Sequence, residues 1–377
     1  MKKKIFLYSP ELEHGGYPPQ CPFDSSRPGR TRQTIVSMGL LSKPDRAEVA
    51  PQRADRATLT RFHDPAYLDL LAAAGHGRIA PLEALKAGLG TPDCPIFPNM
   101  LEYLALAAGA SVAGARRILD GEAAIAFNPA GGFHHAQPAH AAGFCYLNDI
   151  VLAALEFTAA KRRVLFLDLD VHHCDGVQEA FYARSDVMTI SLHESGRTLF
   201  PGTGFVEEIG VGAGRGYSVN IPLPVGTYDE AYERAFRQAA WPLMQAYDPD
   251  VVILELGMDG LAGDPLAHLQ LTNNVYANIV ERVVQMGKPV LATGGGGYNV
   301  PNTVRGWALM WGVLCGEDCS SDLIVGMGGV MLQNTEWLGG LRDRVLLTDG
   351  GRRGAVDDEI EQVVERLRKT VFPIHGL

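Results

Sequence analysis

The chain has 377 residues, of which 46% are hydrophobic and 20% are charged, and its formal net charge at pH 7 is −10. This length allows two or three ordinary domains or one large α/β domain, and the apolar fraction is sufficient for an extensive core. The negative charge argues against nucleic acid as a partner, and the apolar runs fall short of the roughly 20 residues that a membrane span requires.

The start of the chain and its cysteines indicate a cellular location. The N-terminal apolar run, Ile5–Tyr8, ends at Ser9 and Pro10 and is too short for a signal peptide. The six cysteines are scattered and form neither a zinc-ribbon pattern nor a dense disulfide framework. Both features predict a cytoplasmic protein with reduced thiols.

Short apolar runs alternate with amphipathic stretches along most of the chain. The predicted strands are Ile5–Tyr8, Ala124–Phe127, Val164–Leu169, Met188–Leu192, Val219–Leu223, Val251–Leu256 and Val290–Ala292. The predicted helices are Leu101–Leu119, Ile150–Ala160, Gly176–Ala183, Asp229–Ala246, Asn274–Met286 and Thr303–Leu314. This alternation predicts right-handed βαβ units and a mostly parallel sheet with helices on both faces.

Two peripheral segments depart from this alternation. Residues 10–34 are rich in Pro, Gly and Arg, which predicts an irregular rim. The chain becomes Gly-rich after Cys319 and then regains helical periodicity over Asp357–Val371. Because no linker or repeat interrupts the pattern, we expect a single domain over residues 1–377, with 316–377 packed on the main body.

The first polar cluster follows the predicted strand Val164–Leu169. Strand alternation places Asp168, Asp170 and His172 on one face. Two carboxylates and an imidazole at a buried strand end are costly unless a cation holds them. The oxygen and nitrogen donors of this Asp-x-His motif suit Zn²⁺ or Fe²⁺.

A second cluster follows the nearly continuous apolar strand Val251–Leu256. Asp259 lies three residues beyond this strand and would supply a third ligand, which leaves one position open for water. Asp264 is expected to cap the segment that follows it.

Two adjacent histidines, His134 and His135, follow another predicted strand and a Gly-Gly turn. A hydrolytic metal site needs a proton acceptor beside its water, and histidine suits that task at neutral pH. Asp168 and Asp175 are available to hold one imidazole each.

Four glycines, residues 294–297, follow the last predicted strand and precede Tyr298. The run lacks the spacing of a dinucleotide-binding motif and has no phosphate-binding lysine. Glycines allow close backbone approach, and the phenol of Tyr298 is placed to donate to an oxyanion.

Six motifs in this order resemble the histone deacetylase family of the arginase/deacetylase fold, in particular its class I and bacterial acetoin-utilisation branch. The motifs are NPAGGFHHA, AAGFCYLNDIVLA, DLDVHHCDGVQEAFY, VMTISLHESGRTLFPGTG, GMDGLAGDPL and GGGGYNVPNTVRGW. The resemblance covers the chain to about residue 315. It implies a parallel sheet of about eight strands and a zinc-dependent or Fe²⁺-dependent amide hydrolase with one metal ion per chain.

The resemblance also implies roles for individual residues. Asp170, His172 and Asp259 would hold the metal, and Tyr298 would be the oxyanion phenol. His135 would act as general base and then acid, with Asp175 behind it. His134 would act electrostatically, with Asp168 behind it.

Further residues carry over as binding positions. One structural K⁺ would use Asp168, Ser191 and the carbonyls of Asp170, His172 and Leu192, and a second would use carbonyls around Phe181, Arg184, Val187 and Tyr217. The acyl-lysine tunnel would be lined by Gly143, Phe144, Phe200 and Leu266, with Asp93 on its rim and Arg30 at an internal acetate channel.

Three positions depart from the family pattern, and Met258 and Glu255 stand where smaller or uncharged residues are common before the third ligand. Cys174 stands where the family usually has Gly, and Glu255 is a carboxylate inside a predicted buried strand, for which the sequence offers no explanation.

Several functions stay open at this point. Leu266 at the tunnel favours acyl-lysine in a protein or peptide over a small acetylated amine such as a polyamine, although Asp93 or Glu194 could present acid at the rim. The remaining alternatives are a binuclear manganese ureohydrolase of the arginase type, a non-catalytic acyl-lysine binder and a nucleotide-binding module.

Overall fold

The computed structural model describes residues 2–13, 16–317, 319, 340–346 and 350–377. Eight strands within these residues form one sheet in the order β2-β1-β3-β8-β7-β4-β5-β6, and every adjacent pair is parallel. The strands are β1 (Lys3–Leu7), β2 (Arg46–Val49), β3 (Ala123–Asn128), β4 (Val164–Asp168), β5 (Val187–Glu194), β6 (Ser218–Leu223), β7 (Val251–Glu255) and β8 (Val290–Thr293). The predicted parallel α/β fold is confirmed.

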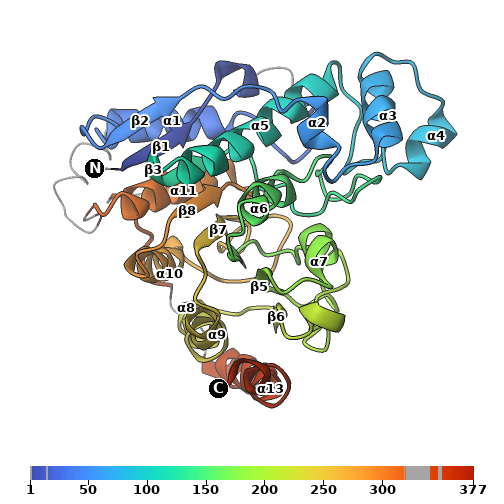
Figure 1. The fold of residues 1–377 in the computed structure, drawn as a ribbon. Helices are drawn as coiled ribbons and strands as arrows, with labels where there is room; N and C mark the ends of the chain where they lie inside the picture. The colour runs from blue at the N-terminus through green and yellow to red at the C-terminus, as the bar shows by residue number, and fades with distance from the viewer. Residues whose placement is uncertain (1, 14–15, 318, 320–339, 347–349) are drawn as a thin grey trace.

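Helices cover both faces of the sheet (Figure 1). One face carries α5 (Met100–Leu119), α6 (Asp149–Ala159) and α7 (Asp175–Phe181). The other carries α1 (Arg27–Ser37), α8 (Asp229–Ala235), the π-helical η3 (Phe236–Ala240), α9 (Trp241–Tyr247), α10 (Asn273–Gln285), α11 (Val300–Leu314) and α13 (Gly350–Thr370). Shorter elements are η1 (Pro10–Glu13), α2 (Arg56–Leu59), α3 (Pro65–Gly75), α4 (Pro81–Lys86), η2 (Gly212–Gly214) and η4 (Phe372–His375).

The strand β4 shows why the central strands are apolar throughout. Leu165 and Leu167 belong to the core under α8–α11, whereas Val164 and Phe166 belong to the core under α5–α7. Successive side chains of a strand point to opposite faces, so a strand covered on both faces has no polar side. Its first polar residue, Asp168, marks the carboxyl end of the strand, where the site begins.

Four parts of the sequence reading need correction. The edge strand β2 was not predicted, because only Arg46 of its four residues is buried and no apolar run marks it. Residues 10–34 are not wholly irregular, since α1 begins at Arg27. The helices α3 and α4 were also missed. The helix predicted over Asp229–Ala246 is interrupted by the π-helical turn η3, just before Pro242.

The C-terminal helix is longer than predicted and packs against β6, α8 and η3. The Gly-rich segment after Cys319 lies largely outside the described residues, so the proposed boundary at residue 315 stays a prediction. Among the helices described here, none is long and apolar enough to cross a bilayer.

Candidate active site

A row of polar residues crosses five neighbouring strands at their carboxyl ends. Asp168 of β4 pairs in register with Glu255 of β7 on one side and Ser191 of β5 on the other. Thr293 of β8 pairs with Glu255 and with Asn128 of β3. All five residues are buried. Loops that leave the sheet at this edge therefore converge on one polar region, the usual location of ligands in parallel sheets.

The three predicted metal ligands meet at this edge. Nδ1 of His172 lies 3.1 Å from Oδ1 of Asp170 and 3.1 Å from Oδ2 of Asp259. One ligand atom from each residue lies within 4.8 Å of the others, and all three residues are buried. Burial opposes a charged imidazole, yet the two carboxylates raise the pKa of His172 to about 10. Burial and Asp170 raise the pKa of Asp259 to about 7.

Backbone groups hold the two carboxylates in place. The N–H of Gly296 donates to Oδ2 of Asp170 at 2.7 Å, and the N–H of Val171 donates to Oδ1 of Asp259 at 2.9 Å. A Cβ at Gly296 would lie 1.8 Å from Oδ2 of Asp259, and one at Gly257 would lie 2.1 Å from Oδ2 of Asp170. Gly296 of the glycine run, as expected from the sequence, and Gly257 outside it thus let the backbone approach the acidic pair.

The adjacent histidines point their Nε2 atoms toward each other, 3.0 Å apart. Nδ1 of His134 lies 3.0 Å from Oδ2 of Asp168, and Nδ1 of His135 lies 2.7 Å from Oδ1 of Asp175. Because a carboxylate only accepts, each Nδ1 carries a hydrogen, and each Nε2 lies on the side of the ring away from its acid. The two carboxylates behind the histidines are those expected from the sequence.

A second carboxylate, Glu255, also faces His134, with Oε1 3.3 Å from Nδ1. Although burial opposes a charged ring, Glu255 and Asp168 hold the pKa of His134 well above its usual value. Burial and the neighbouring charge of His134 lower the pKa of His135 to about 4. His134 is thus the charged member of the pair at neutral pH, and His135 is the neutral member.

The sequence reading missed this partnership. Glu255 is fully buried, and neither of its carboxylate oxygens has a hydrogen-bond partner among the described residues. Burial first, and then the carboxylate of Asp168, raise the pKa of Glu255 well above its usual value. Glu255 pairs in register with Asp168, and this pairing brings it beside His134. The pairing could not be predicted without knowing that β7 lies next to β4 in the sheet.

Cys174 packs without displacing its neighbours. Its side chain is buried in the core under α5–α7, directly before the start of α7. Asp175 keeps its contact with His135, so the cysteine is accommodated as a small apolar residue.

Tyr298 lies close to His172, one of the three predicted metal ligands, and to Phe144. Its ring centroid is 6.4 Å from that of His172 and 5.5 Å from that of Phe144. Burial, together with Asp259, raises the pKa of its phenol well above the usual value, so the hydroxyl stays protonated. Oδ2 of Asp264 accepts from the N–H of Tyr298 at 2.7 Å, while its Oδ1 accepts from the N–H of Leu266, the expected cap.

Phe200, one of the aromatic residues predicted to line the tunnel, lies beside His135. The ring of Phe200 is half exposed and its centroid is 4.9 Å from that of His135. A Cβ at Gly143 would lie 2.5 Å from the ring of His135 and 2.8 Å from that of Phe200, so only glycine fits between them. Oδ2 of Asp93 accepts from the N–H of Gly143 at 3.0 Å and anchors this turn.

The expectation for Arg30 is wrong, because its side chain is exposed on α1 and cannot line an internal channel. Arg27, one helical turn earlier, is buried instead. Its Nη1 donates to the carbonyl of Gly297 at 2.8 Å, and its guanidinium lies 5.0 Å from the ring centroid of Trp307. Helix α1 directs Arg27 inward and Arg30 outward. The Pro- and Gly-rich composition of this segment gave no indication of that helix.

The residues predicted to bind K⁺ lie in two places. Ser191 and Leu192 are buried on β5 beside Asp168, and Oγ of Ser191 is 2.8 Å from Nδ1 of His193. Phe181, Arg184, Val187 and Tyr217 lie between the end of α7 and the starts of β5 and β6. The carbonyls of Phe181 and Tyr217 accept the N–H groups of Arg184 and Thr189, respectively.

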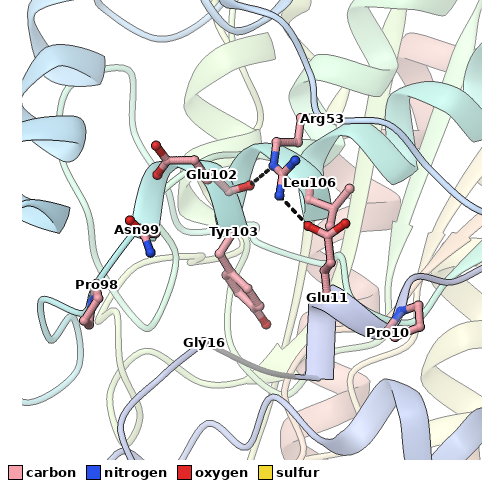
Figure 2. A pocket seen from close by; sticks show the side chains of 9 residues that line it. All are labelled: Pro10, Glu11, Gly16, Arg53, Pro98, Asn99, Glu102, Tyr103 and Leu106. Atoms are coloured by element: carbon pink, nitrogen blue, oxygen red, sulfur yellow. Dashed lines mark hydrogen bonds and ion pairs between the residues drawn. The ribbon is translucent and has the colours of Figure 1, made fainter.

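A surface pocket of about 500 Å³ lies away from these residues, beside the N-terminal part of α5 (Figure 2). An ion pair between Arg53 and Glu11 spans it, and Tyr103 forms part of its lining. None of the predicted site residues lines this pocket.

The parallel sheet and the acid and histidine groups at its carboxyl edge define a protein of the arginase/deacetylase fold. The chain belongs to the histone deacetylase family, because the model of the histone deacetylase domain matches residues 21–314.

Similar proteins support this assignment. Histone deacetylase clr6 of Schizosaccharomyces pombe is 39% identical over 325 residues, which are 85% of this chain and 79% of the relative. Histone deacetylase 8 of Xenopus laevis is 40% identical over 276 residues, which are 73% of this chain and 85% of the relative. The crystal structure of an HDAC homologue from Aquifex aeolicus superposes with a TM-score of 0.86 at 30% identity and covers 97% of this chain and 99% of its own.

Proposed function

We propose that the protein is a metal-dependent lysine deacetylase, which hydrolyses the amide of acetylated or other short acylated lysine side chains in proteins or peptides. The observation that carries the proposal is the pair His134–His135 beside the group Asp170, His172 and Asp259. One histidine is neutral and one is charged, and the pair adjoins a site that fits a divalent cation.

The donor set supports a metal site on chemical grounds. Two buried carboxylates and an imidazole converge, and backbone N–H groups fix both acids. Oxygen and nitrogen donors of this kind suit one Zn²⁺ or Fe²⁺ ion per chain, held by Asp170, His172 and Asp259. A divalent ion bound there would lower the pKa of a water molecule and polarise the acyl carbonyl.

The chain's own residues supply the proton transfers. Nε2 of His135 accepts a proton from the attacking water, because its Nδ1–H is committed to Asp175. The positive charge on His134 favours the negative charge that develops on the substrate oxygen. The protonated phenol of Tyr298 donates to that oxygen, and His135 then returns its proton to the leaving lysine amine.

Two structural K⁺ ions form part of this proposal. Asp168 and Ser191 would hold the first with the carbonyls of Asp170, His172 and Leu192, and the carbonyls between α7 and β6 would hold the second. The first ion would lie behind the acid that supports His134, where buried negative charge accumulates.

The rim favours acyl-lysine over an acetylated polyamine. An acetylated polyamine needs a free carboxylate at the rim to bind its distal ammonium group. Glu194 and Asp93 are the two acids considered for that role. Glu194 is buried and accepts three hydrogen bonds from Thr198 and His268. Asp93 holds the N–H of Gly143. Glu194 is thus fully engaged within the protein, and Asp93 commits Oδ2 to the turn at Gly143.

The test compares kcat/KM for a fluorogenic acetyl-lysine peptide and for acetylspermidine, using protein reconstituted with Zn²⁺ or Fe²⁺. We expect hydrolysis of the peptide, with at least about tenfold lower kcat/KM for acetylspermidine. Activity should disappear on chelation and return with metal. Preference for the polyamine, or turnover unaffected by chelation, would refute the proposal.

A further inference from the structure

Glu194, the last residue of β5, is a buried carboxylate that the reaction does not use. Its side chain is 0% exposed. Oε1 accepts from the hydroxyl of Thr198 at 2.9 Å and lies 2.9 Å from Nδ1 of His268. Oε2 accepts from the N–H of His268 at 2.9 Å. One carboxylate therefore connects two loops that are distant in sequence.

Each of these loops carries a predicted tunnel wall. Thr198 lies two residues before Phe200, whose ring contacts His135. His268 lies two residues after Leu266. The separation of the two walls thus depends on the hydrogen bonds that Glu194 accepts from both sides.

A second carboxylate fixes the other end of the Leu266 loop. Asp264 accepts from the N–H of Leu266 at 2.9 Å and from the N–H of Tyr298 at 2.7 Å. Leu266 is therefore held between Asp264 on the Tyr298 side and Glu194 on the Phe200 side. Because both acids are anchored by short hydrogen bonds, the three loops are connected as one rim.

We propose that Glu194 is a positioning residue that sets the distance between Phe200 and Leu266 and thereby the selectivity of the site for an extended acyl-lysine chain. This inference rests on the proposed deacetylase function. Glu194 acts through the two loops and touches neither the reacting atoms nor the metal ligands. Replacement of Glu194 should therefore weaken the binding of ligands with a long aliphatic chain and leave the rate of the chemical step nearly unchanged.

The first test measures binding of two hydroxamates to metal-loaded protein. Suberoylanilide hydroxamic acid has a long chain that would pass between the predicted tunnel walls, whereas acetohydroxamic acid would be too short to reach them. In Glu194→Leu, which removes every acceptor, we expect the Kd of the long ligand to rise about tenfold and that of the short ligand to change less than about twofold. The KM for an acetyl-lysine peptide should rise similarly, with kcat nearly unchanged.

The matched variant is Glu194→Gln, which has the same shape. Its carbonyl oxygen can accept from the N–H of His268, and its amide group can donate to the hydroxyl of Thr198 and to Nδ1 of His268. We expect this variant to restore most of the long-ligand affinity. A loss as large as that of Glu194→Leu would mean that the hydrogen bonds at this position do not set the affinity, which would overturn the inference.

Two further variants cover the case in which Glu194→Leu does not fold. Thr198→Val removes the hydroxyl contact on the Phe200 side, and His268→Ala removes the ring contact on the Leu266 side but keeps the backbone N–H that donates to Glu194. Each should raise the Kd of the long ligand about threefold. Unchanged affinity in both, or equal weakening of both hydroxamates, would contradict the inference. Failure of the deacetylase proposal itself would appear separately, as wild-type protein that binds hydroxamates but does not hydrolyse the peptide.

Discussion

Two histidines that are neighbours in sequence acquire opposite protonation states from the acids behind them. His134 faces Asp168 and Glu255, whereas His135 faces only the partly exposed Asp175 and feels the charge of His134. The sequence reading identified both histidines and the first acid of each. It could not assign the charges, because these depend on Glu255, which approaches from a strand about 120 residues away.

Replacement of the proposed base tests this assignment of roles. In His135→Ala we expect nearly complete loss of hydrolysis, because no other neutral imidazole in the pair can accept the proton. The divalent metal should remain bound, since His135 is not among its proposed ligands. Steady-state kinetics and elemental analysis on the same sample measure both quantities, and loss of the metal would make His135 a ligand instead.

The phenol of Tyr298 is tested by removing its hydroxyl. Tyr298→Phe keeps the ring contact with Phe144 and should lower kcat by about 10²-fold or more, with little change in KM. The reason is that only the transition state places negative charge beside the phenol. Turnover equal to that of wild type would remove Tyr298 from the mechanism.

At the scale of elements, the central strands of the sheet could be predicted, whereas the edge strand β2 and the peripheral helix α3 were not. β7 is buried at every residue, and its apolar run identifies it directly. β2 forms because it pairs with β1, and its own four residues carry no pattern that predicts this pairing. The start of α3 did carry a signal, since Asp64 precedes Pro65 and its side chain accepts from the N–H of Ala66.

The C-terminal helix α13 should contribute substantially to stability. Leu367 is fully buried against the main core, and Leu367→Ala should lower the free energy of unfolding by about 2–5 kcal/mol. Gln362→Ala, on the exposed side of the same helix, is the control and should change it by less than about 0.5 kcal/mol. Urea unfolding measures both, and equal effects would mean that the helix does not pack as described.

For the whole molecule, buried neutral histidines make stability depend on pH. Burial lowers the pKa of His63 to about 4, and its Nε2 accepts from the N–H of Asn148. The unfolded chain binds more protons between pH 6.5 and 4, so the contribution of His63 is complete above about pH 6.5 and is lost as the pH falls toward 4.

His63→Gln isolates this contribution, because glutamine can make both hydrogen bonds without titrating. We expect the loss of stability between pH 7 and pH 4 to be about 3 kcal/mol smaller in the variant than in wild type. Denaturant unfolding at a series of pH values measures it. Identical pH dependence in the two proteins would show that His63 is not buried in the neutral form.

The whole account depends on one divalent ion held by Asp170, His172 and Asp259. Elemental analysis of wild type, His172→Ala and His135→Ala tests it most directly. We predict about one divalent ion per chain in wild type and in His135→Ala, and strong depletion in His172→Ala. Two ions per wild-type chain, or full occupancy in His172→Ala, would contradict the account.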